Sequence, residues 1–229
     1  MRKNLVIFDV DGLVLNTEFQ WQRAWKTIGK QYNCPEFENV FAKVVGVSGK
    51  AVDEVVGKAL PTYTKEQRET MCKEARELGR EYLEQGIETM PGLTELLDYL
   101  DKIGLCKAVA TTTCRADTKK RLEKLGLYNR FDYILCGDEV VNRKPDPEIY
   151  LKVLQGMQRR PEEALVLEDT GHGVRSAHAA GIDVIMVPSI NPPTPEEQTM
   201  VYDVKNNLYE VMEMIKNIGT VSKGNNKGK

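Results

Sequence analysis

The chain has 229 residues, of which 41% are hydrophobic and 29% charged, a composition that supports a packed core beneath an ordinary polar surface. Its 32 Lys and Arg residues nearly balance 34 Asp and Glu residues, so the net charge of −2 does not indicate binding to nucleic acid or to an anionic membrane. The longest apolar runs, such as Val184–Val187, are far shorter than the roughly 20 residues that span a bilayer. The first residues lead into a strand-like run, and we expect no signal peptide.

The chain contains five cysteines, an odd number, and no CxxC pair. A disulfide framework or a zinc ribbon would favour even numbers and short spacings. We therefore expect reduced thiols in a cytoplasmic protein. The cysteines are Cys34, Cys72, Cys106, Cys114 and Cys136.

The chain contains five short apolar runs, and each of them predicts a strand. Continuous apolar runs of this length are typical of strands that are buried on both faces, as in a parallel sheet covered by helices. The runs are Leu5–Phe8, Lys107–Ala110, Tyr133–Cys136, Ala164–Leu167 and Val184–Val187.

Helical patterns lie between these runs. One apolar stripe begins at Leu93 and ends before Gly104, a second follows Pro145 and Pro147, and a third covers residues 208–218. The alternation of strands and helices predicts an α/β fold with a doubly wound parallel sheet.

The interval from Asn16 to Met90 has helical patterns but no convincing strand. Thr64 and Gln67 have the spacing of a capping box, and one helical face before them carries a stripe of Trp and Ile side chains. A crossover between parallel strands needs far fewer residues. We therefore expect an inserted all-helical domain at 16–89, a core domain at 1–15 and 90–218, and a flexible tail at 219–229.

Acidic and hydroxyl residues follow the predicted strands. Ligands bind outside the carboxyl ends of parallel strands, so these residues should meet at one edge of the sheet. Crowded carboxylates repel one another unless a cation lies among them, and hard oxygen ligands favour Mg²⁺. A magnesium site beside a lysine and a hydroxyl group suits a phosphate group. The residues are Asp9, Asp11, Thr111, Thr112, Thr113, Lys144, Glu168 and Asp169.

Each of these residues also has a purely structural interpretation. Asp9 or Asp11 alone could be a helix cap, Thr111 could cap the following helix, and Lys144 could lie on the surface.

In chain order, the motifs are Asp9-Val10-Asp11-Gly12, Ala110-Thr111, Lys144-Pro145 and Glu168-Asp169. They resemble the four ordered motifs of haloacid dehalogenase-like phosphotransferases, over a region that extends to about Pro188. The chain is most similar to the subgroup with a small helical cap inserted after the first motif, which includes phosphoglycolate phosphatases and β-phosphoglucomutases. The resemblance implies an Mg²⁺-dependent phosphatase that hydrolyses a sugar phosphate or nucleotide-type metabolite.

The resemblance also implies a role for each motif residue. Asp9 would be the nucleophile that forms an aspartyl-phosphate, and Asp11 would be the general acid and base. Thr111 would donate a hydrogen bond to a phosphoryl oxygen, with a following backbone N–H, that of Thr112, helping. Lys144 would offset the charge of the phosphoryl group.

The metal ligands implied by the resemblance are Asp9, the backbone carbonyl of Asp11, Asp169 and Glu168. Glu168 would be a direct or a water-mediated ligand. Because Asp11 already fills the acid/base position, no catalytic role is expected for either histidine, His172 or His178.

Two departures from β-phosphoglucomutases bear on the substrate. Those enzymes carry a histidine in the first cap helix where this chain has Trp21, and an arginine after Gly-Val-Ser where this chain has Gly49-Lys50. The absence of this histidine and this arginine favours a hydrolase over a mutase. A mutase remains the alternative. Trp21 could stack on a sugar or base, or simply pack within the cap. We expect Gly46, Lys50 and Trp21 to contact the substrate.

Other functional classes are weaker interpretations of the same residues. Receiver domains of signalling relays also combine aspartates, a hydroxyl residue and a lysine, but they lack a cap and have the acidic pair before the phosphorylated aspartate. A catalytically inactive binding protein would have little reason to keep every acid. We expect a monomer that acts on a small phosphorylated metabolite, without nucleic-acid or membrane partners.

Overall fold

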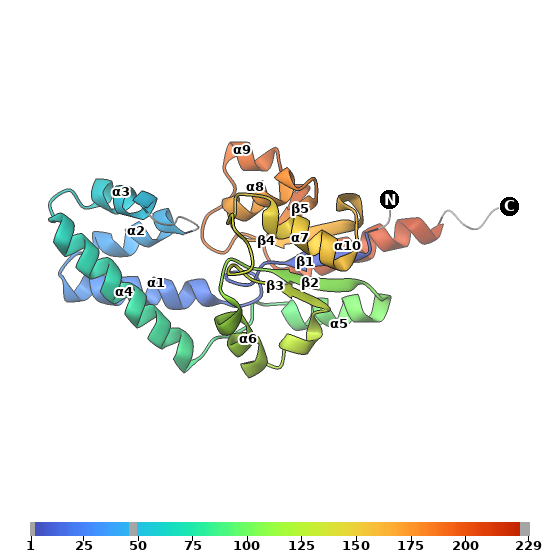
Figure 1. Cartoon of the computed structure of the whole chain (residues 1–229), viewed down its shortest axis with the longest axis horizontal. Helices are drawn as coiled ribbons and strands as arrows, with labels where there is room; N and C mark the ends of the chain where they lie inside the picture. Colours follow the sequence, from blue (N-terminus) through green and yellow to red (C-terminus); the bar gives the residue numbers. More distant parts are fainter. Residues whose placement is uncertain (1–2, 46–49, 225–229) are drawn as a thin grey trace. The chain divides into compact units, whose positions relative to one another are not determined.

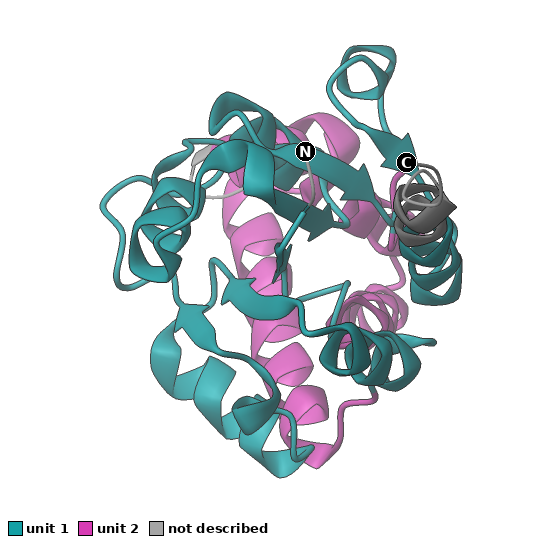
Figure 2. Ribbon diagram, turned by 90° about the vertical axis from the view of Figure 1, so that its right-hand side faces the viewer, with its two compact units in different colours: residues 1–14, 89–188, 193–229 teal, residues 15–88, 189–192 magenta. Residues whose placement is uncertain are grey.

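The computed structural model describes residues 3–45 and 50–224, without the side chains of residue 50 and residues 218–224 (Figure 1). The chain divides into two compact units, which Figure 2 shows in different colours. Unit 1 comprises residues 1–14, 89–188 and 193–229, and unit 2 comprises residues 15–88 and 189–192. The two main boundaries lie one residue before those expected at 16 and 90, but the short segment 189–192 was not expected in unit 2.

Unit 1 is built on a six-stranded, all-parallel sheet with the strand order β3-β2-β1-β4-β5-β6. The doubly wound α/β fold expected from the sequence is confirmed. The strands are β1 Leu5–Phe8, β2 Cys106–Ala110, β3 Tyr133–Leu135, β4 Ala164–Glu168, β5 Asp183–Met186 and β6 Asp203–Val204. The five apolar runs therefore correspond to β1–β5. The strand β6 lies at the edge of the sheet, and no apolar run predicts it.

The central strand β1 pairs with β2 on one side and β4 on the other, so that Leu5 lies opposite Cys106 and Ala164. All four residues of β1 and all five of β4 are buried. Burial of successive residues, which point to opposite faces, requires cover on both sides of the sheet. Tyr150 of helix α7 (Glu148–Met157) and Val174 of helix α8 (Gly171–Ala179) belong to the core on one face. Helix α5 (Leu93–Ile103) packs against both β2 and helix α10 (Leu208–Gly224).

The helices of unit 1 lie between the strands along the chain, except α10, which follows β6. They are α5 Leu93–Ile103, α6 Arg115–Lys124, η1 Tyr128–Arg130, α7 Glu148–Met157, η2 Pro161–Glu163, α8 Gly171–Ala179, α9 Pro195–Gln198 and α10 Leu208–Gly224. The apolar stripe of α5 is buried, and the helix ends at Ile103 with Gly104 as its C-cap, as its pattern predicted. Pro147 is the N-cap of α7.

The last helix differs from the expected boundary. The sequence pattern predicts an end at residue 218 and a tail at 219–229, whereas α10 continues to Gly224. Residues 220–223, Thr-Val-Ser-Lys, contain no proline and can remain helical, and a single glycine at 219 lowers helix stability without breaking the helix.

Unit 2 consists of helices α1 Thr17–Gln31, α2 Glu36–Val44, α3 Lys50–Ala59 and α4 Lys65–Gln85. Its apolar core includes Trp25 and Ile28, as the stripe predicted, and the Trp25 ring stacks on Phe37. The capping box at α4 is present, with Thr64 Oγ1 accepting from Gln67 N and Gln67 Oε1 accepting from Thr64 N. Segment 189–192 joins this unit through Asn191, whose side-chain amide donates to the carbonyl of Ala42.

All five cysteines are free thiols. Within the part of the chain that the structure describes, no helix combines the length and apolar character needed to cross a membrane.

Candidate active site

The candidate residues follow three neighbouring strands of the sheet. Asp9 comes directly after β1, Thr111 directly after β2, and Glu168 is the last residue of β4. The ladder continues into this edge, because Asp9 N donates to the Leu167 carbonyl and Thr111 N to the Leu135 carbonyl, each at 3.1 Å. The sheet therefore fixes the backbone from which these side chains project.

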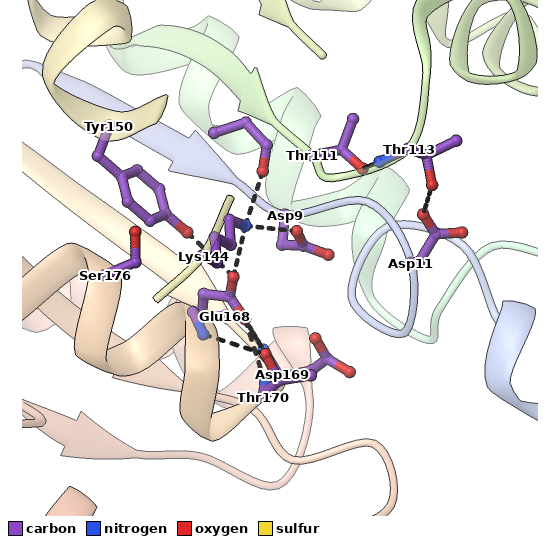
Figure 3. Close-up of polar contacts among 12 residues, drawn as sticks. Asp9, Asp11, Thr111, Thr113, Lys144, Tyr150, Glu168, Asp169, Thr170 and Ser176 are labelled. Atoms are coloured by element: carbon purple, nitrogen blue, oxygen red, sulfur yellow. Dashed lines mark hydrogen bonds and ion pairs between the residues drawn. The ribbon is translucent and has the colours of Figure 1, made fainter. Parts of the chain in front are cut away.

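Lys144 lies at the centre of the cluster (Figure 3). It comes from the loop between β3 and α7, and its side chain is only 4% exposed. Its Nζ donates to Asp9 Oδ1 at 2.7 Å, to Glu168 Oε1 at 2.6 Å and to the Ala110 carbonyl at 2.9 Å. All three ammonium protons have acceptors, and the interpretation of Lys144 as a surface lysine is wrong.

Both oxygens of Glu168 are engaged within the protein. Besides Lys144, Oε1 accepts from the Tyr150 hydroxyl at 3.0 Å, and Oε2 accepts from Asp169 N at 3.0 Å and from the backbone and hydroxyl of Thr170 at 3.1 and 3.2 Å. A direct bond from Glu168 to a metal would have to replace one of these contacts. In this arrangement the carboxylate orients Lys144 and the turn into α8.

The close approach of Glu168 to α8 requires glycine at position 173. A Cβ built on Gly173 would lie 1.8 Å from the Glu168 carboxyl carbon. The same turn is capped by Thr170, whose hydroxyl oxygen accepts from Gly173 N at 3.2 Å. The Thr-Gly-His-Gly sequence after the acidic pair is thus what allows the carboxylate to pack on the first turn of α8.

The carboxylate of Asp11 contacts two residues that the sequence did not single out as candidates for this role. Thr113 Oγ1 donates to Oδ2 at 2.6 Å, and Arg121 Nη1 donates to Oδ1 at 3.0 Å. Thr113 precedes α6 and Arg121 lies on it. Thr113 belongs to a hydroxyl-rich run that is visible in the sequence, but no local pattern distinguishes Arg121 from the other basic residues of α6.

Thr111 is buried and Thr112 is exposed. The hydroxyl oxygen of Thr111 accepts from Thr113 N at 3.1 Å, which leaves the hydroxyl proton available to a ligand. Thr111 therefore shapes the turn after β2, whereas the N-cap residue of α6 is Cys114.

Burial and charge act in opposite directions on the central pair. Burial raises the pKa of Asp9 to about 7; Lys144 opposes this change, while Glu168 and Asp11 add to it. Burial lowers the pKa of Lys144, but Asp9 and Glu168 outweigh it and hold that pKa well above its usual value, so the lysine remains an ammonium. Burial also raises the pKa of Tyr150, which keeps its hydroxyl a donor to Glu168.

The residues at this edge fit a hard divalent cation. Asp169 is 2% exposed and follows β4, the strand next to β1, which Asp9 follows. Among the described residues no three His, Cys, Asp or Glu side chains form a metal-binding group by themselves. Mg²⁺ commonly uses one or two carboxylates and completes its shell with water and substrate oxygens, which two aspartates and a backbone carbonyl can accommodate.

The other expected substrate contacts belong to unit 2 or lie outside the described residues. The Trp21 ring packs on α4 at Gly79, where an added Cβ would come within 2.2 Å of the indole. Gly46 lies outside the described residues. Lys50 begins α3, but its side chain is not described.

Comparison with known proteins agrees with this geometry. The family model of haloacid dehalogenase-like hydrolases matches residues 6–187. A phosphorylated carbohydrates phosphatase from Thermotoga maritima is 34% identical over 188 residues, which cover 81% of this chain and 86% of that protein. A fructose-1-phosphate phosphatase from Escherichia coli is 27% identical over 80% of this chain and 95% of its own length.

A solved structure extends the similarity to three dimensions. A Thermotoga maritima protein provisionally named β-phosphoglucomutase superposes with a TM-score of 0.73 and 28% identity, over 95% of this chain and all of that one. The chain belongs to the haloacid dehalogenase-like hydrolases, and the resemblance inferred from its four motifs is confirmed. Within that family it is a phosphohydrolase.

Proposed function

We propose that the protein is an Mg²⁺-dependent phosphatase that hydrolyses a small phosphomonoester, of the sugar-phosphate class, through an aspartyl-phosphate on Asp9. The observation that carries this proposal is the buried contact between Lys144 Nζ and Asp9 Oδ1, 2.7 Å long, at a strand end next to Thr111. A buried carboxylate beside a fixed cation and a free hydroxyl proton is suited to in-line phosphoryl transfer, which depends on positioning and charge.

In the first step a carboxylate oxygen of Asp9 attacks phosphorus. The bond from phosphorus to the leaving oxygen breaks, and that oxygen keeps the electron pair and takes a proton from Asp11. The Thr111 hydroxyl donates to a phosphoryl oxygen, and Lys144 balances the charge that collects around Asp9.

In the second step a water oxygen bonds to phosphorus while Asp11 takes the water proton. The bond between phosphorus and Asp9 breaks, and its electron pair returns to the carboxylate. Asp9 and Asp169, with the backbone carbonyl of Asp11, would hold the magnesium ion, which would screen the phosphoryl charge. Glu168 would act mainly through its contacts with Lys144 and the turn into α8.

The substrate class is supported by the relatives that are named for a phosphorylated carbohydrate and for fructose 1-phosphate. The alternative is a phosphosugar mutase, which the name of the solved Thermotoga maritima structure favours. Against a mutase stand the sequence departures at Trp21 and Gly49-Lys50. A mutase has to delay the attack of water on its aspartyl-phosphate until the phosphorylated sugar intermediate has rebound.

The test is phosphate release with Mg²⁺ from a panel of β-glucose 1-phosphate, glucose 6-phosphate, fructose 1-phosphate, a ribonucleotide, phosphoglycolate and pyrophosphate. With β-glucose 1-phosphate, glucose 6-phosphate is measured as well, with and without glucose 1,6-bisphosphate. We expect phosphate release from at least one sugar phosphate without the bisphosphate. Formation of glucose 6-phosphate in large excess over phosphate would contradict the hydrolase and support the mutase.

A further inference from the structure

The carboxylate of Asp11 is held on both oxygens by residues of unit 1. Thr113 donates to Oδ2 at 2.6 Å, a contact visible in Figure 3, and Arg121 donates to Oδ1 at 3.0 Å. Neither donor belongs to unit 2. The position of the Asp11 carboxylate in this structure is therefore set within unit 1.

Arg121 is more shielded from solvent than Lys119, a lysine of the same helix. Its side chain is 17% exposed and that of Asp11 is 22% exposed. Lys119, on the same helix, pairs with Glu123 at 3.7 Å, and both of those side chains are about half exposed. Ion pairs shielded from water are screened less than surface pairs, and a guanidinium stays charged at all working pH values. The ion pair between Arg121 and Asp11 is therefore screened less by solvent than the exposed pair between Lys119 and Glu123.

The two side chains that donate to Asp11 differ in conformational freedom. The Thr113 hydroxyl can rotate about its C–O bond, while the backbone N–H of Thr113 remains on Thr111 Oγ1. The guanidinium is a planar fork with fixed N–H directions. Oδ2 can therefore exchange the hydroxyl for a reacting oxygen while Arg121 keeps Oδ1 in place.

We infer that Arg121 is a positioning residue for the hydrolysis of the aspartyl-phosphate, holding Asp11 so that Oδ2 can take the proton of the attacking water. This inference rests on the proposed function. The water oxygen bonds to phosphorus, the proton passes to Oδ2, and the bond from phosphorus to Asp9 breaks with the electron pair returning to Asp9. Arg121 touches none of these reacting atoms.

This role bears on the choice between hydrolase and mutase. A mutase keeps water from its phosphoenzyme by making the alignment of the acid/base group depend on closure around the sugar. Here both contacts that align Asp11 come from unit 1. The base is thus available to water after the alcohol has left, which favours hydrolysis.

The test compares wild-type protein, Arg121→Met, Arg121→Lys and Lys119→Met, with Arg121→Gln in place of the methionine variant if that one is not recovered folded. Steady-state kinetics use the sugar phosphate of the panel above that the wild-type protein hydrolyses fastest. The fraction of phosphoenzyme at saturating substrate is measured by acid quench and intact-mass spectrometry. Lys119→Met controls for loss of a positive charge from α6.

We expect Arg121→Met to lower kcat by about tenfold or more, because positioned general bases contribute at least that much. KM should fall with kcat, and the phosphoenzyme fraction should rise above that of wild type. Arg121→Lys should recover much of kcat, and Lys119→Met should match wild type. An unchanged kcat, or a lower kcat without more phosphoenzyme, would overturn the role of Arg121. An inactive wild-type protein would instead contradict the proposed function itself.

Discussion

Lys144 Nζ lies 2.7 Å from Asp9 Oδ1, although 135 positions separate the two residues in the chain. The contact joins the loop after β3 to the end of the central strand and leaves the lysine side chain 4% exposed. Breaking a buried ion pair by removing one partner is costly because the other charge remains without compensation. The pair is therefore both a structural element of unit 1 and the electrostatic centre of the candidate site.

Replacement of the nucleophile should separate chemistry from folding. Asp9→Asn keeps the shape of the side chain but replaces the nucleophilic carboxylate with a neutral amide, and Lys144 retains Glu168 as its partner. We expect phosphate release to fall at least about 1,000-fold, with a circular dichroism spectrum like that of wild type. Asp98→Asn, on the surface of α5, is the matched control and should retain activity. Normal turnover by folded Asp9→Asn would remove Asp9 from the mechanism.

Metal removal should abolish activity. We expect no phosphate release in EDTA, recovery with Mg²⁺, and much weaker recovery with Ca²⁺, because Ca²⁺ prefers more ligands and a looser geometry. Titration calorimetry of the metal-free protein should show Mg²⁺ binding that is weakened in Asp169→Asn. Full activity in EDTA would contradict the metal site.

The Tyr150 hydroxyl offers a test of the network that holds Glu168. Tyr150→Phe removes one donor to Oε1 from a fully buried position. We expect a loss of about 1–2 kcal/mol in the free energy of unfolding and a several-fold lower kcat, because the carboxylate that orients Lys144 is less constrained. Urea unfolding and phosphate release measure the two effects.

Tyr133→Phe is the control for that change. Tyr133 lies partly buried in the same core, and its hydroxyl is not part of the Glu168 network. The Tyr133→Phe substitution should therefore change kcat little. Equal effects of the two substitutions on kcat would show that the hydroxyl on Glu168 has no special role.

Trp21 should act mainly through packing. Its ring lies on Gly79 of α4 and packs, partly buried, against the apolar cluster of unit 2. We expect Trp21→Ala to destabilise the protein by about 2 kcal/mol and to change KM for a sugar phosphate little. Phe19→Ala, which removes a 57% exposed aromatic ring from the same helix, should cost little stability. A higher KM with unchanged thermal stability would favour stacking on the substrate.

Local patterns in the sequence account for the frame of the molecule. Five apolar runs mark five parallel strands, and the acids that follow them reach one edge because parallel strands share their direction. The edge strand β6 has only two residues and no apolar run, and its pairing with β5 follows from tertiary structure. Segment 189–192 joins unit 2 for the same kind of reason, through a contact with Ala42 distant in sequence.

The contacts around the candidate site were harder to predict. Tyr150 lies in the apolar helical stripe that follows Pro147, but no local pattern indicates that its hydroxyl reaches Glu168. The pairing of Arg121 with Asp11 joins residues 110 positions apart. Several basic residues share α6, and only the packing of that helix decides which one faces Asp11.

Identification of the phosphorylated residue is the most direct test of Asp9 as the nucleophile. Wild-type protein is mixed with Mg²⁺ and the sugar phosphate that it hydrolyses fastest, quenched during turnover, and reduced with borohydride, which converts an aspartyl-phosphate into homoserine. Peptide mass spectrometry then locates the change, with protein quenched without substrate as the control. We expect homoserine at position 9 only, in a substrate-dependent amount. Substrate-dependent homoserine at another position would contradict the assignment of Asp9 as the nucleophile.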